Sequence, residues 1–289
     1  MQAAFTVLAR PSVPKAEHGF LSVLRLAILG PLEFSFLLLF AILLGQKKAA
    51  LLFSFRALEY FKSAILGLLN PFLFYVVIFT AYSRLLGQEA MVLNYVWPIV
   101  LVLLSALLLR QALGLKIIFA LLLSFFGVVL IATRGNPASF TLTDPLGISL
   151  ALGSSIAWAL FWVLNVKDKR DETVKLCLNF FFGSLYAFIM LFALGRFALP
   201  VFEGWLGITY VACFEMGLTF LLWLKAMQLT RTTALIGNLV FISPFLSLIF
   251  LNFILGEKLF LSTFLGLIFI VGGIFIQRWF DRKTGRVLN

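Results

Sequence analysis

The chain has 289 residues, of which 62% are hydrophobic and only 12% charged, and its formal net charge is +11. A soluble domain carries about 25% charged residues, so this surface cannot all face water. Apolar runs of roughly 20 residues recur throughout, which is the length that crosses a bilayer as a helix. A membrane β-barrel would show alternating segments of about ten residues instead. The composition therefore predicts an all-α polytopic membrane protein.

The apolar runs predict a helical bundle of nine membrane spans. The first 19 residues lack a long apolar core, so no cleavable signal peptide is expected. The longest interruption, at 134–144, is the expected linker between two halves. The predicted spans are 20–44, 62–83, 90–109, 116–133, 145–166, 174–194, 204–227, 233–255 and 259–279.

The second half of the chain repeats the first. Residues 210–280 follow the pattern of 64–134, with matched residues spaced by 146. A hydrophobic unit that occurs twice is typical of transporters built from repeats. We expect a first repeat at 1–134, a second at 145–280 and a basic tail at 281–289. The matched pairs are Pro98 and Pro244, Leu113 and Leu259, Leu115 and Leu261, and Gly127 and Gly273.

The basic residues of the loops predict the orientation. One set of alternate loops and the C-terminal tail hold sixteen Lys and Arg residues, and the other set holds four. The positive-inside rule places the first set, and with it the C-terminus, in the cytoplasm. The charge is thus interpreted as a topology signal, and no nucleic acid partner is expected. The minority set is Arg84, Arg134, Arg196 and Lys258.

The N-terminal region does not complete a set of five spans. Nine spans with a cytoplasmic C-terminus place the N-terminus outside, and a five-plus-five protein would have another helix before residue 20. That helix is lost, truncated, or replaced by a segment that folds back. The pair Gly30–Pro31 favours a break there, with a span beginning near Pro31.

Several short motifs occur in a recognisable order. The chain is similar to EamA-type members of the drug/metabolite transporter superfamily over about residues 31–280. The second half carries Ala157-Trp158-Ala159 and then Ala226, Pro244, Gly256-Glu257, Gly266 and Gly272-Gly273; the first half carries Ala81-Tyr82, Pro98, Gln111 and Gly127.

This resemblance implies ten helices in two inverted five-helix repeats, and transport of small solutes by alternating access. Two features depart from the family pattern. The first helix is not recognisable, and Gln111 stands where the second repeat has Glu257.

Glu215 is the strongest candidate for a functional residue. It lies within the predicted span 204–227. A carboxylate at membrane depth costs on the order of 3 kcal/mol, so it should face a cavity, find a partner or be protonated. It is a candidate substrate contact or proton-coupling residue. The alternative is a structural hydrogen bond to a neighbouring helix.

Asn70 aligns with Glu215 if the loop after Arg84 absorbs a difference of one residue. Asn70-Pro71 would then place a polar group beside a proline that frees a backbone carbonyl. The alternative is a simple proline kink. Tyr75, on the same span, is a further candidate contact.

Two predicted spans carry polar groups near a proline. Substrate contacts and hydrogen bonds between helices are both possible for any one of these groups. Pro71, Pro98 and Pro244 are the candidate hinges. Trp158 lies too deep for an interfacial anchor. Gly147, Ala151, Ser155 and Ala159 form a ladder typical of close helix packing. The remaining candidate contacts are Asn94, Trp97, Trp158, Asn238 and Ser243.

The sequence lacks the motifs expected of an enzyme or a channel. There is no His-Glu-x-x-His motif, no phosphate loop and no visible selectivity filter. Neither a cofactor nor a metal is expected, and Cys177 and Cys213 are interpreted as packing residues. By resemblance, we expect a secondary transporter that exports small organic solutes across a bacterial inner membrane. Protons are a possible coupling ion, and a homodimer is possible. The alternative is a non-transporting membrane scaffold or assembly subunit.

Overall fold

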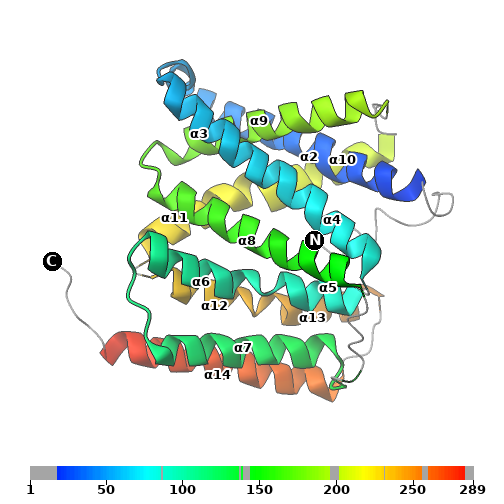
Figure 1. Ribbon diagram of the computed structural model, residues 1–289, viewed down its shortest axis with the longest axis vertical. Helices are drawn as coiled ribbons and strands as arrows, with labels where there is room; N and C mark the ends of the chain where they lie inside the picture. The colour runs from blue at the N-terminus through cyan, green and yellow to red at the C-terminus, as the bar shows by residue number, and fades with distance from the viewer. Residues whose placement is uncertain are drawn as a thin grey trace. The chain divides into compact units, whose positions relative to one another are not determined.

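The computed structural model describes residues 18–85, 87–136, 138, 144–195, 202–230, 232–255 and 260–283, and these residues are helical apart from short connections (Figure 1). The all-α fold class is confirmed. The pair Glu257-Lys258, most of the linker and the end of the basic tail lie outside the described residues.

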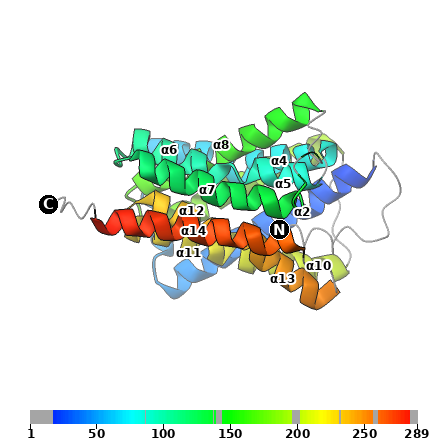
Figure 2. The same ribbon diagram turned by 90° about the horizontal axis from the view of Figure 1, so that it is seen from below.

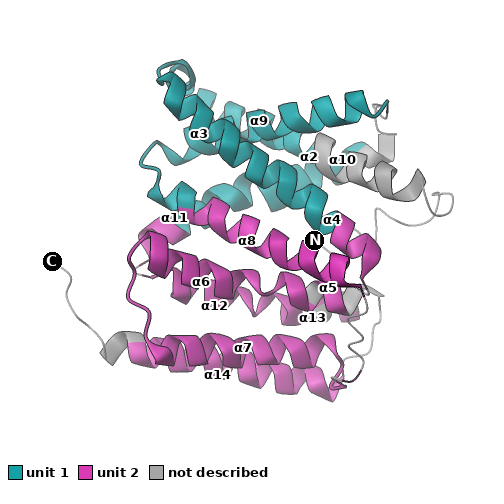
Figure 3. Cartoon of the chain, viewed as in Figure 1, with its two compact units in different colours: residues 1–79, 164–226 teal, residues 80–163, 227–289 magenta. Residues whose placement is uncertain are grey.

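The chain forms two compact units, and each takes helices from both halves of the sequence (Figure 3). Unit 1 comprises residues 1–79 and 164–226, and unit 2 comprises 80–163 and 227–289. The chain passes between the units within three helices, near residues 79, 163 and 226. Contact within each unit thus mixes helices from the two sequence repeats.

Unit 1 is built around α9, which packs against α2, α3 and η2. Two of its long helices contain a π-helical segment, and these two segments are η2 and η4. Its elements are α2 (His18–Gly45), η1 (Ala49–Phe53), α3 (Ala57–Gly67), η2 (Leu68–Leu73), the start of α4 (Phe74–Arg84), α9 (Glu172–Ala193), α10 (Phe202–Tyr210), η4 (Val211–Gly217) and most of α11 (Leu218–Leu229).

Unit 2 is built around the pair α7 and α14, which lie side by side in both views (Figures 1 and 2). Its apolar core joins this pair to α6 and α12 through residues such as Val102, Val128, Phe241 and Ile270. Its elements are the end of α4, α5 (Gly87–Asn94), α6 (Trp97–Leu108), α7 (Leu115–Ala132), most of α8 (Pro145–Lys167), α12 (Thr233–Val240), α13 (Ser243–Leu255) and α14 (Leu261–Lys283).

Six helices of the described chain are long and apolar enough to cross a membrane. Three of the nine predicted spans coincide instead with shorter apolar helices, at 31–45, 92–108 and 233–247. The last two belong to α5–α6 and α12–α13, which are each interrupted by a turn. The protein is therefore a multi-pass membrane protein.

The expected break at Gly30–Pro31 is wrong, because α2 continues through Pro31 from His18 to Gly45. Proline removes one hydrogen bond of the helix ladder but need not end a membrane helix when nearby groups satisfy the backbone. The Ser35 hydroxyl, one turn after Pro31, donates to the Pro31 carbonyl oxygen at 2.6 Å and lies 3.3 Å from the Ala212 carbonyl oxygen, so it links this part of α2 to η4.

The repeat spacing of 146 recurs in the helix boundaries of unit 2. The helices α5, α6 and α7 begin at residues 87, 97 and 115, and α12, α13 and α14 begin at 233, 243 and 261. The interrupting turns, at 95–96 and 241–242, have the same spacing. Two separate stretches of sequence thus adopt the same broken-helix pattern.

Candidate functional site

Asn70 lies where α3 gives way to α4, within the π-helical segment η2. Its backbone angles, φ −155° and ψ 125°, are those of an extended strand rather than a helix. Pro71 follows and has no N–H to donate, so this turn cannot complete the regular hydrogen-bond ladder. Such local π segments in helices occur often at functional sites.

The Asn70 side chain is fully buried, and neither its amide nitrogen nor its amide oxygen has a hydrogen-bond partner among the described residues. Buried polar groups are normally paired, so each exception calls for a physical reason. The adjoining Pro71 ring packs closely on α9, since a Cβ on Gly183 would lie 2.8 Å from the Pro71 Cγ. Asn70 therefore stands at a buried break of the helix, with its amide unpaired within the described part of the chain.

Tyr75, in the first turn of α4, is 1% exposed, and its hydroxyl also lacks a partner in the described part of the chain. Its ring packs against Phe74 and Phe79. Unit 1 therefore contains both Tyr75 and Glu215, two candidates separated by 140 residues of sequence.

Glu215 lies on η4, the π-helical segment between α10 and α11. This segment packs against α2, where a Cβ on Gly217 would lie 2.7 Å from Leu38. The carboxylate makes no ion pair or hydrogen bond with any described residue, and its side chain is partly exposed. Asn70 and Glu215, aligned from the sequence, therefore both lie on π-helical segments of unit 1.

The candidate hinges Pro98 and Pro244 stand at equivalent places in unit 2. Pro98 lies in the first turn of α6, and Pro244 is the second residue of α13. At this position the missing proline N–H is not needed, because a helix leaves its first four N–H groups without internal partners. The prolines thus start the second half of each broken helix. The turn that separates the halves falls just before them.

Asn94, Trp97 and Trp158 are brought together in unit 2. The Ser155 hydroxyl lies 3.2 Å from the carbonyl oxygen of Leu93 and 3.3 Å from that of Asn94, which joins α8 to the end of α5. The rings of Trp97 and Trp158 meet edge to face with centroids 6.0 Å apart. The expected small-residue packing face on α8 is confirmed, since Ala151 packs in a cluster with residues of α4 and α5.

Asn238 and Ser243 each contact a residue that the sequence did not single out. The Asn238 amide donates to Gln277 Oε1 at 2.7 Å, and both side chains are buried. The Ser243 and Tyr95 hydroxyls are 2.7 Å apart. Gln277 is a polar residue near the end of the predicted span 259–279, and this position could have identified it as a candidate. Tyr95 stands beside Asn94 on the predicted span 90–109.

The described residues contain no group of three or more His, Cys, Asp or Glu side chains that could hold a metal ion. Cys177 and Cys213 are both free thiols, and Cys177 is buried. The candidate site therefore offers amide, hydroxyl, carboxylate and aromatic groups.

The arrangement matches known proteins at the level of fold and family. A chain described as "Crystal structure of protein" is similar over 97% of this chain and 93% of its own length, with a TM-score of 0.78 and 19% identity, which establishes a shared fold alone. No curated protein matches the chain. The model of the EamA-like transporter family matches residues 2–133 and 145–278. The chain belongs to the EamA-like transporter family.

Proposed function

We propose that this protein is a secondary transporter that moves small organic solutes, such as metabolites, amino acids or drugs, by alternating access. One observation carries the proposal beyond family membership: helices at matching places in the two halves are broken. The turns at 95–96 and 241–242 are 146 residues apart, and Asn70 and Glu215 each lie on a π-helical segment. Discontinuous helices of inverted repeats commonly build the solute and ion sites of transporters.

Each unit by itself offers groups at these breaks that can bind charged, polar or aromatic parts of organic solutes. In unit 1, Asn70 and Tyr75 offer unpaired buried groups, and Glu215 offers a carboxylate. In unit 2, Asn94 adjoins Trp97 and Trp158. Amides and hydroxyls can bind a carboxylate or amine, and tryptophan can cover an apolar or cationic group.

Glu215 is the coupling or substrate-contact residue in this proposal. Nothing in the packing of an apolar helix requires a carboxylate, and an ionised one must be satisfied at membrane depth. A proton released when a cationic solute binds would favour the inward and outward states differently. That difference is the minimum requirement for coupling.

The direction proposed is export across a bacterial inner membrane, with the C-terminus in the cytoplasm. Proteoliposomes containing the purified chain should accumulate or release at least one solute from a panel of amino acids, amines and aromatic metabolites faster than empty vesicles. If no solute in a broad panel moves under either a proton or a solute gradient, the scaffold interpretation replaces transport.

A further inference from the structure

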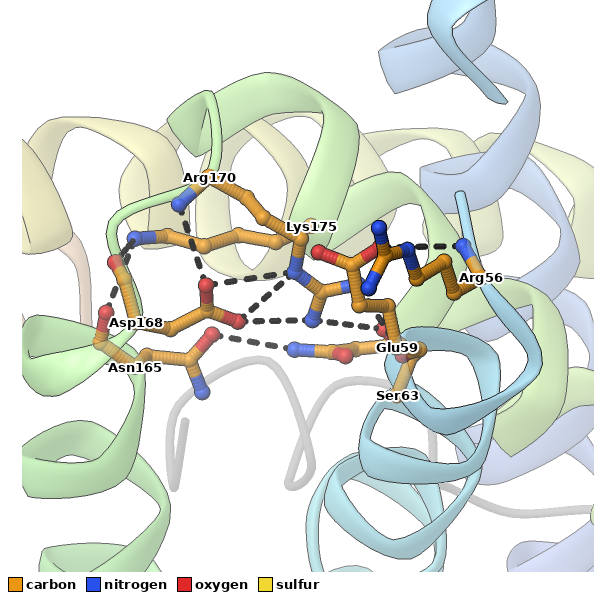
Figure 4. A network of polar contacts seen from close by, with 8 residues as sticks. Arg56, Glu59, Ser63, Asn165, Asp168, Arg170 and Lys175 are labelled. Atoms are coloured by element: carbon orange, nitrogen blue, oxygen red, sulfur yellow. Dashed lines mark hydrogen bonds and ion pairs between the residues drawn. The ribbon is translucent and has the colours of Figure 1, made fainter. Parts of the chain in front are cut away.

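Two loops of unit 1 are joined by a polar network (Figure 4). One loop, with η1 and the first turns of α3, covers residues 46–63, and the other covers 167–172. Arg170 reaches across, donating to the Glu59 carbonyl oxygen at 3.1 Å and to the Ser63 hydroxyl at 3.0 Å. Lys48 and Asp171 form an ion pair at 2.6 Å. We call these contacting loops the paired loops.

Lys175 and Asn179 fix the end of α8 beneath the paired loops. The Lys175 ammonium is fully buried and donates to the carbonyl oxygens of Asn165 at 2.8 Å and Asp168 at 2.6 Å. The Asn179 amide donates to Asn165 Oδ1 at 3.0 Å. A cation at the carbonyl end of a helix is stabilised by the helix dipole and by direct hydrogen bonds. The paired loops therefore rest on an ordered base.

The network engages most of the acidic groups of the paired loops. Asp168 accepts hydrogen bonds from the Arg170 guanidinium at 2.6 and 2.9 Å, and Asp171 forms the ion pair with Lys48. The Glu59 carboxylate accepts a hydrogen bond from the Arg56 backbone N–H at 3.0 Å. Burial raises the pKa of the Asp168 carboxyl, but the hydrogen bonds and positive charge of Arg170 lower that pKa by more. The pKa of Asp171 is likewise lowered against burial, chiefly by Lys48. Both carboxylates therefore stay ionised and paired near neutral pH.

Positive charge remains after this pairing. The paired loops, residues 46–63 and 167–172, contain seven basic and four acidic side chains, a net charge of +3. Four lysines are spare, because their side chains make no ion pair or hydrogen bond with a described residue. Lys47, Lys62, Lys167 and Lys169 are all exposed. The positive-inside rule accounts for basic loops, but not for an ordered network that leaves these lysines at the surface.

Large apolar side chains are exposed on the loop that carries Lys47 and Lys62. Phe53 is 84% exposed, Leu58 63% and Phe61 62%. Because α2, α3, α8 and α9 are membrane helices, the loops between them lie at the bilayer surface. Exposed aromatic and aliphatic groups beside lysines are typical of surfaces that enter the headgroup and upper acyl region.

We propose that the paired loops form a docking surface for anionic phospholipids, with the spare lysines on the headgroup phosphate and Phe53, Leu58 and Phe61 on the acyl chains. Charge complementarity selects this occupant, because basic clusters next to membrane helices attract anionic lipid headgroups. The apolar side chains favour a lipid over a free anion. This surface is independent of what the protein transports.

A thermal-shift titration tests the proposal on the full-length protein in a neutral detergent. Phosphatidylglycerol should raise the unfolding temperature, and phosphatidylcholine and inorganic phosphate should not. In the triple variant Lys47→Gln/Lys62→Gln/Lys169→Gln, the apparent affinity for phosphatidylglycerol should fall on the order of 100-fold. Each lysine near a membrane surface contributes a factor of roughly five, and the three factors multiply. Its unfolding temperature without lipid should match the wild type, because these lysines make no contact in the network.

The control variant Arg110→Gln/Lys116→Gln/Arg278→Gln removes the same charge from exposed residues of unit 2. It should keep most of the affinity for phosphatidylglycerol. An equal loss in both variants would show a diffuse response to net charge and overturn the site. An equal shift with inorganic phosphate would assign the lysines to a soluble anion, and no shift with phosphatidylglycerol would exclude the lipid.

Discussion

Gly127 and Gly273, spaced by 146 residues, make the same contact from opposite helices. A Cβ on Gly127 would meet the carbonyl oxygen of Gly266 on α14, and one on Gly273 would meet the carbonyl oxygen of Ala120 on α7. These carbonyl positions are themselves 146 apart. The Ser124 hydroxyl donates to the Ile270 carbonyl oxygen, again across this spacing. The α7–α14 contact is thus formed by equivalent residues of the two repeats.

The close approach makes Gly273 sensitive to a single methyl group. Gly273→Ala places that group against backbone, which cannot rotate away, and should destabilise the protein by about 1–3 kcal/mol. The adjacent Gly272 is the matched control, because a Cβ there has nothing within 4 Å. Gly272→Ala should be neutral or stabilising by up to about 1 kcal/mol. Thermal unfolding in detergent measures both, and equal stabilities would contradict the packing.

The sequence was informative about this contact because repeat spacing and helix packing leave local signals. Glycines 146 residues apart, and the small-residue face from Gly147 to Ala159, can be read directly from the chain. The broken helices were harder to predict, since α5–α6 and α12–α13 are apolar on both sides of their turns. Only the nearby prolines marked the breaks.

The polar network of the paired loops could not be predicted from the sequence, for a different reason. Arg170 and Lys175 were counted as topology signals, but Arg170 is only 7% exposed in its side chain, and Lys175 is fully buried. Lys175 donates to backbone carbonyls, and Arg170 contacts Glu59 and Ser63 more than 100 positions away as well as nearby Asp168, so no local pattern reveals the full network.

Gln111 has a structural role in this protein. Its Oε1 accepts hydrogen bonds from the Thr233 backbone N–H at 3.1 Å and from the Thr233 hydroxyl at 2.9 Å, at the start of α12. Gln111→Ala should cost about 0.5–2 kcal/mol, as for loss of a helix cap. Gln111→Glu keeps the acceptor and should retain stability. Gln228→Ala, which removes an amide without a described partner, is the control for unfolding measurements.

The Asp168–Arg170 pair should make stability depend on acidity. The folded state lowers the pKa of Asp168 below the unfolded value of about 3.9. The pair therefore stabilises the fold at pH values above that unfolded pKa, and this contribution is lost as the pH falls through the lower pKa of the folded state. The unfolding temperature of wild type should fall on acidification below about pH 4. Asp168→Asn should start lower at pH 7 and lose less over the same range. Parallel curves would mean that other carboxylates dominate.

The orientation can be measured separately from transport. Sixteen basic residues lie on one predicted side and four on the other, so a reporter fused after Asn289 should be cytoplasmic. Alkaline phosphatase and green fluorescent protein fusions give opposite readouts for the two sides. An active phosphatase fusion would reverse the assignment of the loops and place the C-terminus outside the cytoplasm.

Glu215→Gln should retain insertion and folding but abolish transport or uncouple it from the proton gradient. The amide keeps the shape and hydrogen-bonding capacity of the side chain, and η4 already lacks a described ion pair that the substitution could break. What the variant loses is a group that can exchange a proton or pair with a cationic solute. The decisive measurement is flux against pH for wild type and variant in matched vesicles. Glu33→Gln, which neutralises another half-buried carboxylate of unit 1, should follow the wild-type curve. If Glu215→Gln does so too, in both height and shape, the carboxylate is structural and protons are coupled elsewhere or not at all.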